Sequence, residues 1–181
     1  MRVCSPSVAH WQAWPAGSPH PAEERAHQPG HLAAVLRQQR LPADALQIEL
    51  TESTLLEDVD YAVYLLNNLQ NDGVKISLDD FGTGYSSLSY LSRLPINKIK
   101  IDKSFVRHLT TDTTSRAVTE AIITLGRRLK LDIIAEGIET ETMLDEVNDL
   151  GCHQVQGHYL SVPLDSEAFK DWYLAQERAL N

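Results

Sequence analysis

Two adjacent carboxylates followed by a glycine-containing loop are the residues of this chain best suited to chemistry. Asp79 and Asp80 follow an alternating apolar stretch at 74–78 and precede Gly82 and Gly84. Neighbouring like charges repel unless a cation or a hydrogen-bond donor stabilises them. Carboxylates are preferred ligands of Mg²⁺ and Mn²⁺, so the pair fits a metal site. A solvated acidic turn is the alternative, because Asp and Gly are also ordinary loop residues.

Further motifs place polar side chains where other predicted strands end. In chain order they are Glu49-Leu50-Thr51-Glu52, Lys100-Ile101-Asp102, Glu136-Gly137-Ile138-Glu139 and Gln154-Val155-Gln156. Each is weak alone, since two glutamates three residues apart are common at helix N-termini. Ionisable groups that reach one centre from successive strand ends are the active-site arrangement of a (β/α)₈ barrel.

Strand-like and helix-like stretches alternate from residue 31 onward. Alternating apolar and polar residues predict strands at 46–50, 74–79, 98–102, 132–137 and 153–156. Apolar stripes at helical spacing predict helices at 31–40, 57–70, 86–93, 113–130, 141–150 and 165–178. This order predicts an α/β fold with a parallel sheet and crossover helices.

The polar side of these strands favours a barrel over an open sheet. Strands buried on both faces of an open sheet read as continuous apolar runs, whereas several strands here have one aliphatic and one polar side. A complete barrel of this type needs about 250 residues. The 181-residue chain therefore predicts a (β/α)₈ TIM-type barrel that is incomplete at its N-terminal end.

The N-terminal part of the chain differs in composition from the rest. Five of the eight prolines fall within the first 30 residues, which show neither helical nor strand periodicity. We therefore interpret residues 1–28 as an irregular or disordered leader and residues 29–181 as the domain. A leader tied down by Trp11 and Trp14 is the alternative.

Charge and cysteine content exclude several classes of function. The net charge of −9 disfavours broad binding to a DNA or RNA polymer or to an anionic membrane. No stretch is apolar enough to predict a membrane span. Cys4 and Cys152 form neither a metal-type spacing nor a disulfide framework, which favours a reducing cytoplasm.

Taken together, the motifs resemble the EAL-domain family, the cyclic-di-GMP phosphodiesterases. The most specific segments are ELTES at 49–53, DDFGTGYSSL at 79–88, IKIDKSFV at 99–106, AEGIET at 135–140 and VQG at 155–157. The resemblance implies a modified (β/α)₈ barrel that hydrolyses cyclic-di-GMP to linear pGpG with two Mg²⁺ or Mn²⁺ ions. It also implies a possible homodimer through the loop after Asp80.

The resemblance further implies a role for each motif residue. The metal ligands would be Glu49, Asp79, Asp80 and Asp102; the catalytic group would be Lys100, Glu52 and Glu136; and Gln156 and Glu139 would hold substrate or water. Lys100 would orient or deprotonate the attacking water, and nearby cations would lower its pKa. The alternative for Lys100 is a plain ion pair with Asp102. Glu52 would fix the loop at 81–87.

Two motifs of the family are missing from this sequence. The chain contains no Glu-Ala-Leu tripeptide, and Ala16-Gly17-Ser18 stands about where the resemblance predicts an Asn-Leu-Ser type motif. Each of these motifs would supply a metal ligand. A degenerate, non-catalytic EAL module that binds cyclic-di-GMP or a protein partner is therefore the alternative to an enzyme.

Overall fold

A single parallel sheet organises the chain in the computed structural model, which describes residues 2–3, 31–55, 59–84 and 91–180. Its order is β1-β6-β5-β4-β3-β2, and every neighbouring pair is parallel. The strands are β1 (Arg2–Val3), β2 (Gln47–Thr51), β3 (Lys75–Phe81), β4 (Lys98–Ile101), β5 (Asp132–Glu136) and β6 (Gln154–Gln156). The predicted parallel α/β class is confirmed.

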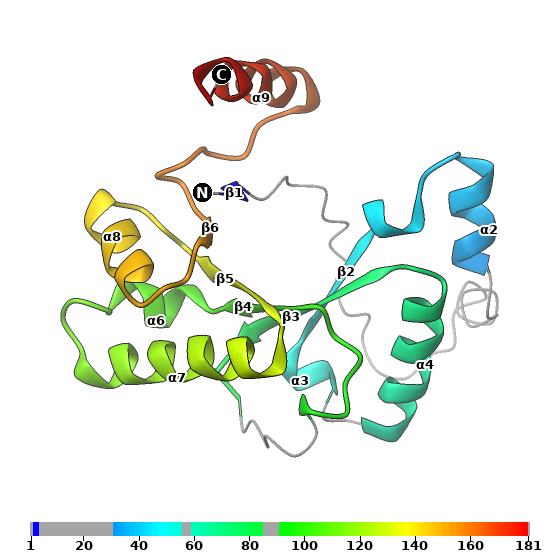
Figure 1. Ribbon diagram of the computed structural model, residues 1–181, viewed down its shortest axis with the longest axis horizontal. Helices are drawn as coiled ribbons and strands as arrows, with labels where there is room; N and C mark the ends of the chain where they lie inside the picture. The colour runs from blue at the N-terminus through cyan, green and yellow to red at the C-terminus, as the bar shows by residue number, and fades with distance from the viewer. Residues whose placement is uncertain (1, 4–30, 56–58, 85–90, 181) are drawn as a thin grey trace, which may run out of the picture.

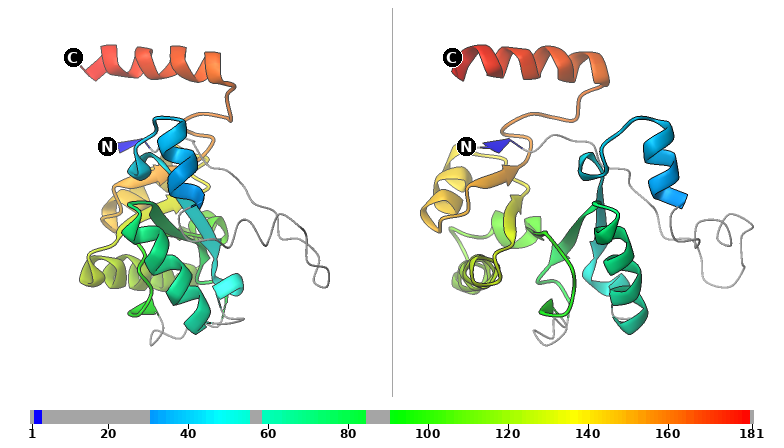
Figure 2. Two further views of the ribbon diagram at one scale, coloured as in Figure 1. Left: turned by 90° about the vertical axis from the view of Figure 1, so that its right-hand side faces the viewer. Right: turned by 45° about the vertical axis from the view of Figure 1, so that its right-hand side comes forward.

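Helices connect the strands and flank the curved sheet (Figure 1). They are α2 (His31–Gln38), the 3₁₀ turn η1 (Ala43–Ala45), α3 (Glu52–Leu55), α4 (Val59–Asn71), α6 (Lys103–Arg107), α7 (Thr113–Leu129), α8 (Glu141–Asp149) and α9 (Ser166–Leu180). Figures 1 and 2 both show α9 beyond the end of β6 and away from the sheet.

The predicted elements agree with these bounds to within one or two residues at most ends. The short helices α3 and α6 were not predicted, because each is a single turn or little more and begins at a strand-end motif. The helix predicted at 86–93 falls mostly outside the described residues. In the predicted leader, Arg2–Val3 forms β1 beside β6, and residues 4–30 lie outside the described residues.

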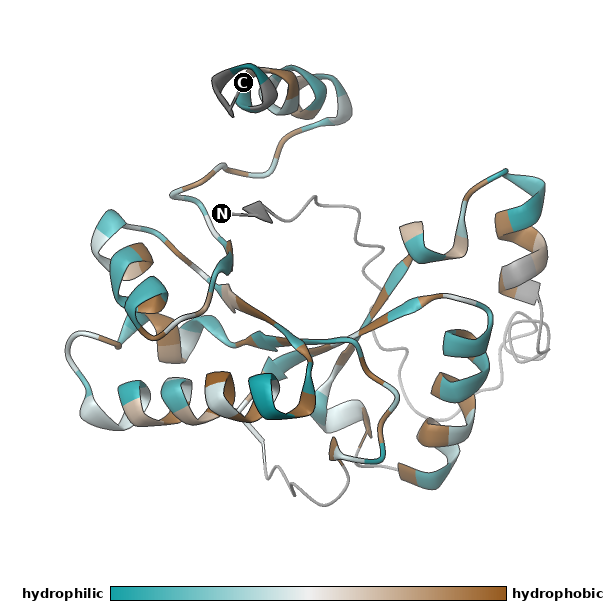
Figure 3. Cartoon of the chain, in the orientation of Figure 1, coloured by the Kyte–Doolittle hydropathy of each residue, from teal (hydrophilic) through white to brown (hydrophobic). Residues whose placement is uncertain are grey.

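One side of the sheet forms the hydrophobic core with the helices. Ile76, Leu78, Ile99, Ile101 and Ala135 are essentially fully buried in this core. Figure 3 shows hydrophobic stretches along the strands and, along α7, hydrophobic stretches that alternate with hydrophilic ones. Because side chains alternate along a strand, burying these residues directs the polar residues between them to the other side of the sheet.

Asn97 holds β3 and β4 in their relative register. Its side-chain Oδ1 accepts a hydrogen bond from the backbone N–H of Ile76 at 2.9 Å. Its own N–H donates to the Ile76 carbonyl at 2.8 Å. This two-point contact helps to fix how the strand that contains Asp79 lies beside the strand that contains Lys100.

Candidate metal centre

A β-bulge in β3 brings Asp79 and Asp80 to the same site. Leu78 pairs with Ile99 and Phe81 with Ile101, so β3 has one more residue than β4 over this interval. Asp80 takes up the difference with a φ of 54°, in the left-handed region that Asp tolerates better than most residues. Its N–H donates to Asp79 Oδ1 at 3.0 Å.

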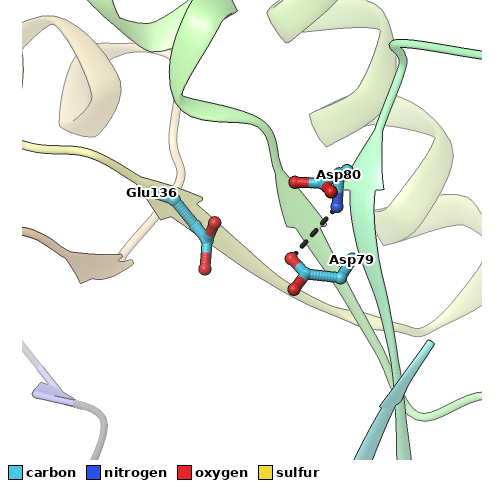
Figure 4. A group of neighbouring side chains, drawn as sticks. All are labelled: Asp79, Asp80 and Glu136. Atoms are coloured by element: carbon cyan, nitrogen blue, oxygen red, sulfur yellow. Dashed lines mark hydrogen bonds between the residues drawn. The ribbon is translucent and has the colours of Figure 1, made fainter. Parts of the chain in front are cut away.

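Glu136, at the end of β5, completes a cluster of three carboxylates. Figure 4 shows Asp79 and Asp80 on the side of β3 that faces Glu136. Oxygen atoms from the three residues all lie within 4.8 Å of one another. The predicted convergence of strand-end carboxylates is therefore present in the structure for these three residues.

The Lys100 ammonium lies among the carboxylates, with its side chain only 6% exposed. Its Nζ is 2.9 Å from Glu49 Oε2, 3.1 Å from Asp79 Oδ1 and 2.6 Å from Glu136 Oε1. Burial acts to lower the pKa of Lys100, but the hydrogen bonds and charges of its carboxylate partners outweigh burial and raise that pKa. This direction comes from the protein's own groups, whereas the lowered pKa expected from the sequence depends on bound cations and stays a prediction.

Negative charge is nevertheless in excess at this site. Burial first, and then the charges of Asp79 and Asp102, raise the pKa of Asp80. Burial also raises the pKa of Glu136, with Asp79 and Glu49 adding to the effect and Lys100 opposing it. One ammonium therefore does not fully compensate the carboxylates around it.

The donor set suits a hard divalent cation. Clustered carboxylate oxygens are the ligands that Mg²⁺ and Mn²⁺ prefer. A cation bound to Asp79, Asp80 and Glu136 would offset the excess charge that raises the pKa values of Asp80 and Glu136. The residues present therefore fit the metal that the sequence predicts.

Asp102 and Glu52 flank the cluster. Asp102 caps α6, where its Oδ1 accepts a hydrogen bond from Ser104 N at 3.0 Å. Lys100 pairs with the carboxylates of neighbouring strands, and Asp102 instead lies close enough to Asp80 to affect its pKa. Glu52 is 1% exposed and accepts a hydrogen bond from Gly82 N at 3.3 Å.

Gly84 approaches Glu52 closely from the same loop. A Cβ added at Gly84 would lie 2.9 Å from Glu52 Cδ, which is too close for an unshifted side chain. Glu52 therefore holds the described part of the predicted loop, and residues 85–87 lie outside the described residues. Glu52 is thus in contact with the loop that follows Asp80.

The other two predicted residues lie at the edge of the site. Gln156 is in register with Glu136 on the adjacent strand and is exposed. Glu139 forms an ion pair with Arg107 of α6, and this hydrogen-bonded pairing lowers the pKa of Glu139. Its side chain is 42% exposed, outside the cluster of Asp79, Asp80 and Glu136.

Sequence reasoning missed a second polar layer next to the cluster. Gln47 Nε2 donates to Glu49 Oε1 at 3.0 Å, and Lys98 Nζ donates to Gln47 Oε1 at 3.0 Å. Both residues lie two positions before a predicted site residue, Glu49 or Lys100, and therefore point to the same side of the sheet. That parity was the available signal.

A protein-family model described as the EAL domain matches residues 18–163, which is most of the chain. The chain belongs to the EAL domain family. The match begins inside the predicted leader, at residue 18. The expected TIM-type fold is confirmed, because the solved structures similar to this EAL domain are EAL domains, which are TIM-like barrels.

Two curated relatives come from Pseudomonas aeruginosa. The bifunctional diguanylate cyclase/cyclic di-GMP phosphodiesterase MucR is 46% identical over 134 residues, covering 74% of this chain and 19% of that protein. The cyclic di-GMP phosphodiesterase NbdA is 39% identical over 140 residues, covering 77% of this chain and 18% of NbdA. The EAL domain described here thus spans about a fifth of these relatives.

Solved structures agree with the family assignment. The PaMucR phosphodiesterase in complex with c-di-GMP has a TM-score of 0.75 at 41% identity, covering 83% of this chain and 59% of that chain. Klebsiella pneumoniae BlrP1 with manganese and cyclic-di-GMP has a TM-score of 0.68 at 32% identity, covering 77% of this chain and 34% of that chain.

Within the described residues of this EAL domain, no helix is long and apolar enough to cross a membrane.

Proposed function

We propose that this EAL domain hydrolyses cyclic-di-GMP to linear pGpG. The observation that supports this most directly is the cluster of Asp79, Asp80 and Glu136 around the buried Lys100 ammonium. Relatives named as cyclic di-GMP phosphodiesterases and a similar structure solved with manganese and cyclic-di-GMP support the substrate and the need for a metal.

Divalent cations would be held by the acidic residues at the strand ends. Asp79 and Asp80 would be the central ligands, together with Glu49, which shares Lys100 with Asp79, and Asp102, which is close enough to affect the pKa of Asp80. Mg²⁺ or Mn²⁺ held there would lower the pKa of a water molecule and offset negative charge on the phosphodiester. The resemblance to the EAL family implies two ions, and the number of acidic side chains at the site is compatible with that count.

Lys100 acts as a cationic hydrogen-bond donor in this proposal. Its carboxylate partners raise its pKa, and its ammonium would orient the attacking water or a phosphate oxygen. Water supplies the oxygen of the new P–O bond, and the departing 3′ oxygen takes up a proton. Glu136, which can reach a cation held by Asp79 and Asp80, and Gln156 would hold metal-bound water or substrate beside Lys100, and Glu52 would keep the loop after Asp80 in place.

A pocket beside Gln156 is suited to one part of the substrate. It has a volume of about 210 Å³ and lies between the residues after β6 and the aromatic side chains Phe169 and Trp172 of α9. Pockets for whole drug-sized ligands usually measure about 300–1,000 Å³. The pocket would therefore take up one flat nucleobase and not the whole dinucleotide.

The test is a direct assay of the purified chain. Cyclic-di-GMP and Mn²⁺ are added, and pGpG is quantified by chromatography for wild type, Asp79→Asn and the exposed control Asp171→Asn. The proposal expects turnover by wild type and Asp171→Asn and a loss of about 10- to 100-fold or more in Asp79→Asn, because losing a group that only supports a metal ligand already costs this much. Absence of pGpG from the folded wild-type chain would reject the enzymatic proposal.

A binding module is the second candidate, favoured by the missing Glu-Ala-Leu and Asn-Leu-Ser type motifs. Calorimetry with cyclic-di-GMP separates the two candidates, since tight binding without pGpG formation supports the module.

The homodimer through the loop after Asp80 stays a prediction, because residues 85–90 lie outside the described residues. The cytoplasmic location likewise stays a prediction.

A further inference from the structure

Gln47 connects two lysines through one glutamate. Its Oε1 accepts from Lys98 Nζ at 3.0 Å, and its Nε2 donates to Glu49 Oε1 at 3.0 Å. The other oxygen of that glutamate, Oε2, accepts from Lys100 Nζ at 2.9 Å. The result is a continuous chain of hydrogen bonds from Lys98 through Gln47 and Glu49 to Lys100.

The fold explains how side chains from β2 and β4 meet across the strand between them. Ser77 of β3 is in register with Glu49 on one side and with Lys98 on the other. It is 0% exposed, and its short side chain leaves the space above β3 to the longer residues. The contact between Gln47 and Lys98 therefore depends on a small residue at position 77.

Lys98 determines which way the Gln47 amide points. An ammonium group has donors and no acceptor, so it must face the amide oxygen. The amide nitrogen then faces Glu49 and donates to its Oε1. An apolar residue at position 47 could do neither, and the Glu49 Oε1 would lose the hydrogen bond that it accepts from Gln47.

We propose that Gln47, oriented by Lys98, is a positioning residue that fixes the Glu49 carboxylate for cation binding. Hydrogen bonds behind a metal ligand commonly set its orientation, and their loss typically weakens metal affinity about 10- to 100-fold. The inference rests on the proposed function, in which Glu49 is a metal ligand. It assigns a supporting role to two further residues: Gln47, which hydrogen-bonds Glu49, and Lys98, which hydrogen-bonds Gln47.

The test measures Mn²⁺ binding to Gln47→Met, which keeps the length of the side chain but removes both hydrogen bonds. Isothermal titration should give a dissociation constant about 10- to 100-fold above that of wild type. The exposed control Gln70→Met should bind Mn²⁺ as wild type does. If Gln47→Met does not fold, as judged by circular dichroism, Gln47→Leu takes its place.

The dependence of turnover on Mn²⁺ concentration distinguishes positioning of a metal ligand from a purely structural role of Gln47. Turnover of cyclic-di-GMP by Gln47→Met should fall at low Mn²⁺ and recover toward the wild-type rate at saturating Mn²⁺, with KM for the nucleotide unchanged. Wild-type affinity for Mn²⁺ in a folded Gln47 variant would overturn the inference.

A second measurement keeps this inference separate from the proposed function. If the wild-type chain neither binds Mn²⁺ nor forms pGpG, the proposed function fails. Urea unfolding of Gln47→Met, Glu49→Met and the double variant then shows whether Gln47 and Glu49 interact. Shifts in the unfolding midpoint that fail to add show that Gln47 restrains Glu49. Additive shifts would overturn the inference.

Discussion

The carboxylates of Asp79 and Asp80 lie on the same side of β3, although they belong to consecutive residues (Figure 4). Consecutive residues of a regular strand point to opposite faces. The extra residue between Leu78 and Phe81, together with the φ of 54° at Asp80, turns the second carboxylate back toward the first. A single strand thereby supplies two acidic groups to one site.

Asp80 should therefore have separable effects on folding and on metal binding. Asp80→Asn keeps a residue that tolerates positive φ, so its unfolding free energy should stay close to that of wild type while Mn²⁺ binding weakens. Asp80→Val should lower the unfolding free energy by about 1–2 kcal/mol, because a β-branched residue is strained in this region. Urea unfolding and Mn²⁺ titration measure the two effects. Equal stability of Val and Asn at this position would show that the bulge does not require positive φ.

Side-chain parity made much of the site predictable. Alternation placed Glu49, Asp79, Lys100 and Glu136 on the polar side of parallel strands, and the structure confirms that they meet there. The bulge was not predictable, because its signal lies in the pairing between β3 and β4 and not in the residues themselves.

The ion-pair partners of Lys100 could not be predicted from the sequence either. Asp102 is its neighbour on the same side of a regular strand, but α6 begins directly after Asp102 and uses that side chain as a cap. The contacts of Lys100 depend instead on the register between strands, to which Asn97 contributes. Long-range register of this kind has no local signature.

Replacing Lys100 by Met should strongly destabilise the fold. The substitution leaves several buried or half-buried carboxylates without their shared cation, and breaking a buried ion pair typically costs about 3–5 kcal/mol. The exposed control Lys75→Met should change the unfolding free energy by no more than about 0.5 kcal/mol. Urea unfolding at neutral pH without added metal is the measurement. A Lys100→Met variant as stable as Lys75→Met would show that the carboxylates do not depend on Lys100.

Glu136→Gln should have the opposite effect, and it should depend on pH. Because burial raises the pKa of Glu136, the folded state binds its proton more tightly than the unfolded state. The contribution of Glu136 to stability is therefore fully present below its unfolded pKa, about 4.3, and is lost as pH rises through the higher folded pKa. Replacing this glutamate by the neutral amide should raise the Tm at pH 8.

The Tm difference between Glu136→Gln and wild type should shrink as pH is lowered toward 4. Thermal unfolding without metal at several pH values gives this comparison, with the exposed Glu167→Gln as control. A gain in Tm that is the same at pH 8 and pH 4 would contradict a raised pKa. The same substitution removes a carboxylate from the cluster, so the more stable variant should bind Mn²⁺ more weakly.

A substitution at Gly126 can test whether the packing of α7 on β5 positions the end of β5 that contains Glu136. A Cβ at Gly126 would lie 1.9 Å from Ile133 Cδ1, so the helix or the strand must move. Alanine gains up to about 1 kcal/mol in helix propensity, whereas overpacking costs about 1–3 kcal/mol. Gly126→Ala should therefore lower the unfolding free energy and, if β5 shifts, weaken Mn²⁺ binding at Glu136.

Ile133→Val shows whether this contact is the cause, because it removes the methyl group nearest the added Cβ. In wild type the change should cost about 0.5–1.5 kcal/mol, as is usual for a buried Ile. In the Gly126→Ala background it should cost less, because it removes the closer of the two overlaps and leaves only Ile133 Cγ1, 2.7 Å from the added Cβ. Urea unfolding of the two single variants and the double variant measures the coupling. Purely additive effects would mean that α7 and β5 accommodate the extra methyl elsewhere, and Glu136 should then bind Mn²⁺ normally in Gly126→Ala.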